Sequence, residues 1–237
     1  MKNKSTVPSI KDCTPTNIRD LGNEYHNAFV TFIDILGFKN IVENEEAESI
    51  NSRLDAMLLF NKLPQKRRDL YSKENYLPMT VQISDSIIRI QPVPLVNSDD
   101  FNILDFFIGE LESLIISQGN LACNGIFIRG GITFGKICVH KSRIFGPAFN
   151  RAYQLESNLA RYPRIILDDN IIADRNNPLL DYIKKYDWNN LKDCIFELLH
   201  RDFDGLYFTQ YLTHILSSKK SKILKYYLHT KIKLMKI

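Results

Sequence analysis

An apolar run near the start of the chain, from Ala28 to Phe38, contains a single charged residue, Asp34. A run so rich in β-branched and aromatic residues is typical of a strand buried on both faces of a sheet. Burying an unpaired carboxylate is costly, so acids are rare in such surroundings. Asp34 therefore lies either at the exposed end of the strand or beside a cation, and the second reading is our working hypothesis.

After this strand the hydrophobic pattern changes period. Apolar residues from Phe38 to Leu58 recur at spacings of three and four, which predicts a helix with one buried face. Residues 64–78 are charged and irregular and predict a loop. Met79 to Val93 predicts two short strands meeting at a hairpin turn, Ser84-Asp85-Ser86.

The second half of the pattern begins with a helix predicted from Phe101 to Ser117. A strand from Ile126 to Val139 follows, and Gly130, Gly131 and Gly135 interrupt it. Glycines inside a strand indicate a bulge or the close approach of something to the backbone. The remaining expected elements are a helix (148–159), a strand (164–167), short helical pieces (179–186 and 191–199), a turn (202–205) and an amphipathic stretch (206–216).

This order of elements predicts an α+β fold of the ferredoxin-like style, in which helices pack on a mainly antiparallel sheet. We expect a polar N-terminal lead-in over residues 1–26, a catalytic domain over 27–168 and a small helical C-terminal extension over 169–237. The whole chain of 237 residues, 44% of them hydrophobic, is long enough for one full core.

Charge and cysteine content narrow the class of protein. A formal net charge of +4 is too small to indicate nucleic acid, and the lysine-rich tail after Lys219 is better read as a solvated helix or frayed end. The four cysteines lie far apart without a CxxC pair, which favours free thiols in a reducing compartment. No long apolar segment is present, so we expect a cytoplasmic protein without a membrane span.

Two acids are candidates for chemistry. Asp34 ends a buried strand and Asp85 sits at the tip of an apolar hairpin, so both can project from neighbouring strand ends. Paired carboxylates are what Mg²⁺ or Mn²⁺ needs when it also holds phosphates. The alternative for Asp85 is a turn-forming role, and Asn150 can simply cap its helix. The glycine-rich strand lacks the spacing of a phosphate-binding loop.

These pieces, in this order, resemble the class III nucleotidyl cyclase catalytic domain over residues 27–168. That family carries Phe-x-Asp-Ile-x-Gly-Phe, matched by Phe32 to Phe38, and a turn with a second metal Asp, matched by Ser84-Asp85. It also carries Arg-x-Gly-Ile-x-x-Gly, matched from Arg129 to Gly135. The last motif is matched by Gly146, Asn150, Ala152, Leu155 and Glu156.

The resemblance implies a homodimer that binds a nucleoside triphosphate at sites shared between the subunits. Asp34, Asp85 and the carbonyl of Ile35 would hold two divalent metal ions, Mn²⁺ or Mg²⁺. Amides from Leu36, Gly37 and Phe38 would receive the triphosphate. The partner chain would supply Asn150, which orients the ribose.

Three departures from the family pattern bear on specificity and activity. The two positions that read a purine base hold Val81 and Arg143 here, so neither ATP nor GTP is indicated. The family's phosphate-binding Arg is replaced by Gln154, a loss that normally weakens the transition state. Arg151 is our first substitute for that Arg, ahead of Arg129 and Arg143.

Arg89 is a further candidate for nucleotide binding. It shares a strand face with Asp85 if the second hairpin strand is regular, and it then reaches into the cleft. The alternative is a surface Arg on a half-exposed strand.

A closer resemblance, to the bacterial Pycsar pyrimidine cyclases, rests on Phe145 to Glu156, on Phe203-Asp204-Gly205 and on Tyr211-Leu212. It implies conversion of UTP, or CTP, to a 3′,5′-cyclic monophosphate that activates a separate effector in antiphage defence. An Arg donor suits the uracil O4 acceptor, which favours UTP. The alternative is a catalytically impaired cyclase-like domain that binds a nucleotide or a partner, and nucleic-acid binding is the weakest hypothesis.

Overall fold

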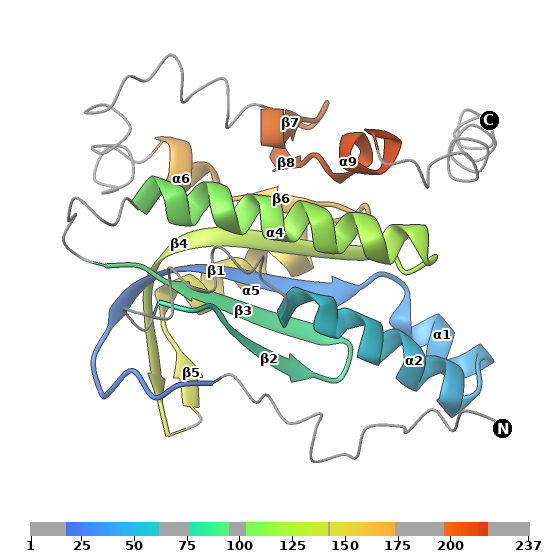
Figure 1. Ribbon diagram of the computed structural model, residues 1–237, viewed down its shortest axis with the longest axis horizontal. Coiled ribbons are helices and arrows are strands. Elements are labelled where there is room, and N and C mark those ends of the chain that lie inside the picture. The colour runs from blue at the N-terminus through green and yellow to red at the C-terminus, as the bar shows by residue number, and fades with distance from the viewer. Residues whose placement is uncertain (1–17, 62–75, 95–102, 142, 174–196, 218–237) are drawn as a thin grey trace, which may run out of the picture.

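The computed structural model describes residues 18–61, 76–94, 103–141, 143–173 and 197–217, which form a sheet with helices on both faces (Figure 1). The sheet has the order β2-β3-β1-β4-β6-β8-β7, and β5 pairs with the end of β4. The strands are β1 (His26–Ile35), β2 (Met79–Ile83), β3 (Ser86–Pro92), β4 (Ile128–His140), β5 (Arg143–Phe145), β6 (Ile165–Leu167), β7 (Leu199–Arg201) and β8 (Tyr207–Thr209).

Two long helical segments cover the sheet, α4 on one face and α5 with its continuation η3 on the other. The described helices are α1 (Phe38–Asn44), α2 (Ala47–Met57), the 3-10 turn η2 (Leu58–Asn61), α4 (Ile103–Cys123), α5 (Pro147–Gln154), the π-helical turn η3 (Leu155–Leu159), α6 (Asp169–Ala173) and α9 (Tyr211–Ser217). None of these helices is long and apolar enough to cross a membrane.

The predicted fold class is confirmed. Among the described strands only β4 and β6 pair in parallel, so the sheet is mainly antiparallel. The first strand lies in the interior of the sheet, between β3 and β4, and both of its faces are covered by helices, which explains why its sequence is apolar on both faces.

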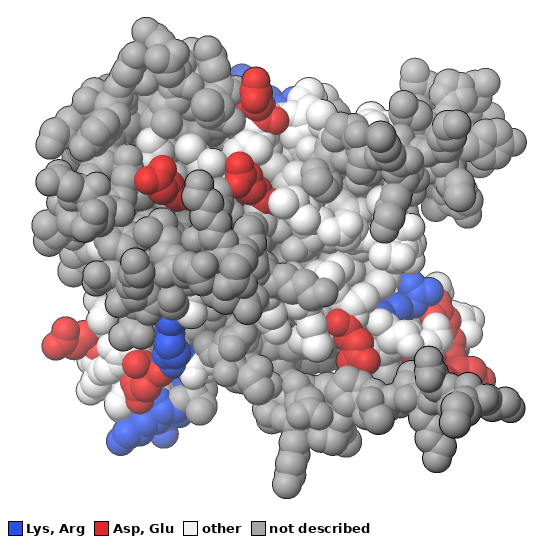
Figure 2. Space-filling model, viewed as in Figure 1, with Lys and Arg blue, Asp and Glu red and all other residues white. Residues whose placement is uncertain are grey.

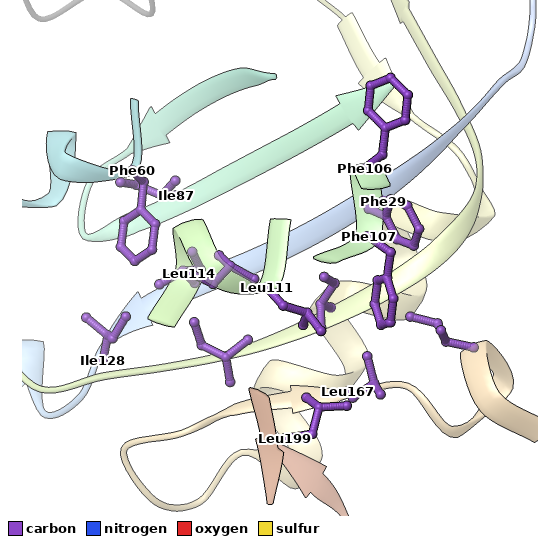
Figure 3. Close-up of a cluster of buried hydrophobic side chains, with 14 of the residues drawn as sticks. Phe29, Phe60, Ile87, Phe106, Phe107, Leu111, Leu114, Ile128, Leu167 and Leu199 are labelled. Carbon is purple, nitrogen blue, oxygen red and sulfur yellow. The ribbon is translucent and has the colours of Figure 1, made fainter. Parts of the chain in front are cut away.

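Alternation along β1 divides the core into two layers. Phe29 and Ile33 face α4, whereas Ala28 and Val30 face α5. On the α4 side, the rings of Phe29 and Phe107 stack with centroids 5.1 Å apart, and Figure 3 shows them beside Leu111 in the larger cluster. Burial on both faces fixes the register of β1, because a slip of one residue would exchange the two layers.

The glycines of β4 mark a close approach, as the sequence predicted. A Cβ on Gly131 would lie 2.3 Å from the Cβ of Leu155 and 2.9 Å from the carbonyl oxygen of Ala152. The pairing of β1 with β4 runs without a bulge from His26 to Ile35. The helix backbone of α5 and η3 therefore rests directly on the strand, and this contact places the helix over the sheet.

Some local expectations differ from the structure. The helix predicted after Phe38 is two helices, α1 and α2, because Glu45 and Glu46 are extended. In the region expected to be a helical extension, β7 and β8 add strands to the main sheet and α9 packs on α4. The helical piece expected at 179–186, most of the one expected at 191–199 and the lysine-rich tail lie outside the described residues.

Arg89 is the clearest correction. Its side chain is fully buried under α4, where Nε donates to Oε1 of Glu110 at 2.7 Å and the guanidinium also bonds to the carbonyl oxygen of Phe60. Arg89 has the same strand parity as Ile87, which faces the α4 core. It therefore braces the interior between β3, η2 and α4 and does not reach a nucleotide cleft.

Candidate active site

The two acids singled out in the sequence come together. Ile33 pairs with Ile87 in the β1–β3 ladder, so Asp34 at the end of β1 lies opposite the start of β3. Ser86 Oγ donates a hydrogen bond of 3.1 Å to Asp34 Oδ1, and the Asp85 carboxyl hydrogen-bonds to Asp34 as well. The tight turn that positions Asp85 includes Ser84 in a left-handed conformation, with φ of 55°.

Arg129 and Glu156 complete the charged group. Arg129 pairs with Asp34 across the β1–β4 ladder, and its Nη2 lies 3.4 Å from Asp34 Oδ2. Its Nε lies 2.9 Å from Oε1 of Glu156, which η3 buries against the sheet. This last contact is an ion pair only, because neither atom meets the geometry of a hydrogen bond. One cation thus faces three acids.

This imbalance changes the titration of Asp34. Burial is the largest cause, and the hydrogen bond and negative charge of Asp85 add to it, so the pKa of Asp34 rises from 3.8 to about 7. The charge of Glu156 acts in the same direction, and the Ser86 hydrogen bond opposes it. Burial also raises the pKa of Glu156, which Arg129 counteracts. Ionised carboxylates this close repel each other, so the site is suited to accept an additional cation.

The donor atoms fit a hard divalent cation. Asp34 and Asp85 offer carboxylate oxygens at one point of the surface, the ligand type that Mg²⁺ and Mn²⁺ prefer. Within the described part of the chain no group of three or more His, Cys, Asp or Glu side chains is arranged to hold a metal. The pair would therefore need further oxygens, such as the Ile35 carbonyl, water or phosphate. That requirement suits Mg²⁺, which is often bound by one or two carboxylates together with substrate phosphates.

The loop after β1 is ordered by its own hydrogen bonds. Gly37 has φ of 79° and begins α1, and it accepts hydrogen bonds from the amides of Asn40 and Ile41. The amide of Leu36 donates to the carbonyl of Phe127 at 2.8 Å, so it is not free to bind a triphosphate. Of the three amides predicted to bind the triphosphate, those of Gly37 and Phe38 remain candidates.

Helix α5 presents Asn150 away from its own sheet. Ala148 and Ala152 are buried against β4, whereas Asn150 and Gln154 are exposed one turn apart on the outer side. The structure also shows that Asn150 lies within the helix, because the N-cap is Gly146. The side chain of Asn150 is therefore exposed on the outer side of the helix.

The side chain of Arg151 is directed at Asp168 and not at the outer face of α5. Its Nε and Nη2 donate to the two carboxylate oxygens of Asp168, at 3.0 and 2.7 Å, and Thr133 donates to the same carboxylate at 2.6 Å. Asp168 is buried at the end of β6. Arg151 thus ties α5 to the sheet, and it does not share the outer face that Gln154 shares with Asn150.

The two positions expected to read the base lie apart within one chain. Val81 is buried on the α5 side, in the cluster that also contains Ile88 and Phe32. Arg143 is exposed on β5, where it pairs with His140 at the far end of β4 from Arg129. Arg129 and His140 are eleven positions apart along β4, which corresponds to roughly 36 Å at 3.3 Å per residue.

Sequence reasoning did not assign Arg129 and Glu156 to the site as a pair. The available signal was an acid, Glu156, beside the apolar Leu155 on a helix predicted to face the sheet. Its partner became visible only with the β1–β4 register, which sets Arg129 opposite Asp34.

The sequence matches no family model and no curated protein. Among solved structures, it is similar to the guanylyl cyclase domain of the RhoGC fusion protein from Blastocladiella emersonii, with 15% identity, 78% of this chain and 95% of that chain covered, and a TM-score of 0.49. The adenylyl cyclase CyaB from P. aeruginosa is similar at 16% identity, with 80% and 96% covered and a TM-score of 0.43. The guanylyl cyclase Cya2 is similar at 14% identity, with 80% and 93% covered and a TM-score of 0.42.

These structural neighbours are adenylyl and guanylyl cyclases. With each identity below 25% and each TM-score below 0.5, the likeness carries no argument about activity.

Proposed function

We propose that this protein is a metal-dependent nucleotide cyclase that acts as a homodimer on a pyrimidine nucleoside triphosphate. The observation that carries the proposal is the contact between Asp34 and Asp85 at the end of the central strand, where the pKa of Asp34 is raised to about 7. A carboxylate pair held so unfavourably needs a cation, and the hairpin and strand that position it match the cyclase motifs of the sequence.

In the reaction, the ribose 3′-oxygen forms a bond to the α-phosphorus, the bond to the bridging oxygen breaks, and pyrophosphate leaves as the hydroxyl proton passes to water. Bound divalent metals would neutralise the phosphate charge and favour ionisation of the 3′-hydroxyl. Asp34 and Asp85 would hold these ions, with the Ile35 carbonyl as a further ligand. The amides of Gly37 and Phe38 bind phosphate oxygens, and Asn150 orients the ribose.

A homodimer follows from where the remaining residues lie. Asn150 faces away from its own sheet, and Arg143 lies at the opposite end of β4 from Asp34. A second copy can bring both to the metal carboxylates of the first. Tyr153 and Phe145 expose 51% and 45% of their surface near these two residues, which supplies apolar area for such an interface.

Base selection rests on fewer residues than the sequence suggested. Arg89 is committed to Glu110, which leaves the apolar Val81 and the partner's contribution of Arg143. A guanidinium can donate to O4 of uracil, whereas cytosine has an amino group there and shares only the O2 acceptor, so UTP is the preferred substrate and CTP the second choice. The cyclic product would act in the cytoplasm on a separate effector protein, in antiphage defence of the Pycsar type.

The decisive experiment incubates the purified protein with each of the four nucleoside triphosphates and Mn²⁺ and identifies the products. We expect cyclic UMP, or cyclic CMP, as the main product. Asp34→Ala and Asp85→Ala should abolish it, whereas Asp55→Ala, an exposed acid on α2, should not. Cyclic AMP as the main product would refute the pyrimidine assignment, and full activity of Asp85→Ala would refute the metal site.

A second candidate function is nucleotide binding without turnover. The observation in its favour is that the outer face of α5 carries Gln154 where the family has an Arg, while Arg151 is held by Asp168. It predicts that UTP binds in the presence of Mn²⁺ but that no cyclic product forms with any of the four triphosphates.

A further inference from the structure

A pocket with a volume of about 350 Å³ lies away from Asp34 and Asp85, between the segment that follows η3 and the β7–β8 turn. None of its lining residues belongs to the candidate active site. Its volume is within the range of small-molecule sites. Its walls combine aromatic rings with a few polar side chains, among them Tyr162, Phe203, Arg161 and Arg164.

The aromatic wall is a corner formed by two exposed rings. Phe203 exposes 85% of its surface and Tyr162 exposes 46%. Their ring centroids are 6.4 Å apart and the ring planes meet at 61°, so the rings touch edge to face. A planar ring can stack on one of them while its edge meets the other, which is the favoured geometry for aromatic contacts.

The turn that carries Phe203 is held rigidly although Phe203 itself contributes little burial. Arg164, whose side chain is 4% exposed, forms ion pairs with both Asp202 and Asp204. The Asp202 amide donates to the Leu206 carbonyl, the Gly205 amide donates to the Asp202 carbonyl, and Gly205 has φ of 85°. An exposed ring gains little from the hydrophobic effect, so Phe203 contributes little to the stability of the fold. The anchoring of the turn instead holds the ring in a fixed position for a ligand.

The charges of the pocket leave one cation available. The carboxylate oxygens of Asp204 are engaged by Arg164 and by the Leu206 amide. Arg161 is exposed, and its guanidinium has no ion pair or hydrogen bond to any residue that the structure describes. A guanidinium at the rim of an aromatic corner is suited to a carboxylate or phosphate group.

We propose that this pocket binds a planar aromatic ring carrying one anionic group, of the size of a nucleoside monophosphate. The ring stacks in the corner of Tyr162 and Phe203, and the anionic group pairs with Arg161. The proposal does not depend on the function of the Asp34–Asp85 site, which is a different place on the molecule.

Calorimetric titration of the full chain tests it, with the four nucleoside 5′-monophosphates and their 3′,5′-cyclic forms as probes. A chelator removes divalent ions, so the Asp34–Asp85 site cannot contribute through a metal. We expect at least one probe to bind, and Arg161→Ala and Phe203→Ala each to weaken binding at least tenfold. Lys136→Ala, which removes an exposed cation from β4, and Asp85→Ala should leave it unchanged.

Three results would overturn the proposal. One is that no probe binds. Another is that binding is lost in Asp85→Ala and kept in Phe203→Ala, which would place the nucleotide at the metal carboxylates. The third is that Phe203→Ala changes only the oligomeric state in sedimentation, which would make the turn a protein interface. None of them bears on cyclase turnover, which the triphosphate panel measures separately.

Discussion

At the scale of single residues, the charge of each site residue is set by its immediate neighbours. Among the residues that the structure describes, Asp34 faces Asp85 and Glu156 with Arg129 as the one balancing cation, whereas Asp168 receives two hydrogen bonds from Arg151 and one from Thr133. Both carboxylates are largely buried, but only the first is undercompensated. This difference separates a site that needs a ligand from one that is complete within the fold.

Asp34 predicts a pH dependence of stability in the metal-free protein. Its pKa in the folded state is about 7, above the ordinary 3.8, so the folded state binds the proton more tightly than the unfolded state. The contribution of Asp34 to stability is therefore fully present below about pH 4 and falls by on the order of 1 to 3 kcal/mol as pH rises to about 7. Thermal melts give the melting temperature of the wild type and of Asp34→Asn at each pH in this range. The effect is the difference between the two proteins in how steeply the melting temperature changes with pH.

Addition of Mn²⁺ should remove most of that fall, because a bound cation takes the place of the proton. If the melting temperatures of wild type and Asp34→Asn changed equally with pH, the pKa of Asp34 would not be raised in the folded state.

Arg151 is expected to act on stability and not as a catalytic cation. Arg151→Ala leaves the buried Asp168 with an unpaired charge, so the free energy of unfolding should fall by about 1–3 kcal/mol. Adding Asp168→Asn should recover part of the loss. Urea denaturation of the single and double variants measures the coupling. Unchanged stability of Arg151→Ala together with a large fall in kcat would return Arg151 to a catalytic role.

At the scale of elements, the glycine strand β4 determines how closely α5 approaches the sheet. Gly131 lies under Leu155 and Ala152, so the outer face that carries Asn150 is fixed by a backbone contact on the inner face. Arg151 and Asp168 fasten the same helix to β6. On the opposite face, α4 is fastened through the buried pair of Glu110 with Arg89.

Gly131→Ala should therefore displace α5 and η3 and destabilise the protein by roughly 1–3 kcal/mol, in the range of other overpacking changes. The matched control is Gly135→Ala on the same strand, whose Cβ would meet the Cβ of Ala148 at 3.4 Å, an ordinary contact. Chemical denaturation compares the two variants. Equal stability of both would mean that the helix moves away without cost.

At the scale of the whole molecule, the residues assigned to one reaction lie on surfaces that a single chain does not bring together. Figure 2 shows the charged side chains on one face as separate groups of both signs among the described residues. Asp34, which we propose as a metal ligand, is at one end of β1, and Arg143 is at the far end of β4. A two-fold pairing of copies is the simplest assembly that joins them.

Complementation tests this assembly. Asp85→Ala and Asn150→Ala should each be inactive alone, because every composite site then lacks one residue. In an equal mixture, random exchange makes half of the dimers mixed, and each mixed dimer has one intact site of two, so about a quarter of wild-type activity returns. Absence of any recovery, with subunit exchange verified by sedimentation of tagged chains, would place both residues in the site of one chain.

The sequence by itself determined the elements whose signals are local. The apolar run with Asp34, the hairpin turn at Asp85, the period of α4 and the glycines of β4 each follow from neighbours a few residues away, and the α+β class follows from their order. The strands β5, β7 and β8 were missed because each is only three residues long and mixes polar with apolar residues, unlike the equally short but wholly apolar β6.

Only the tertiary structure decided where the arginines go. Arg89, Arg129 and Arg151 are alike in sequence, yet one is buried against Glu110, one bridges Asp34 and Glu156, and one holds Asp168. In each of these four ion pairs the partner acid lies at least seventeen positions away along the sequence. A long side chain finds its partner across the packed layers, so its role depends on register and packing that no local pattern contains.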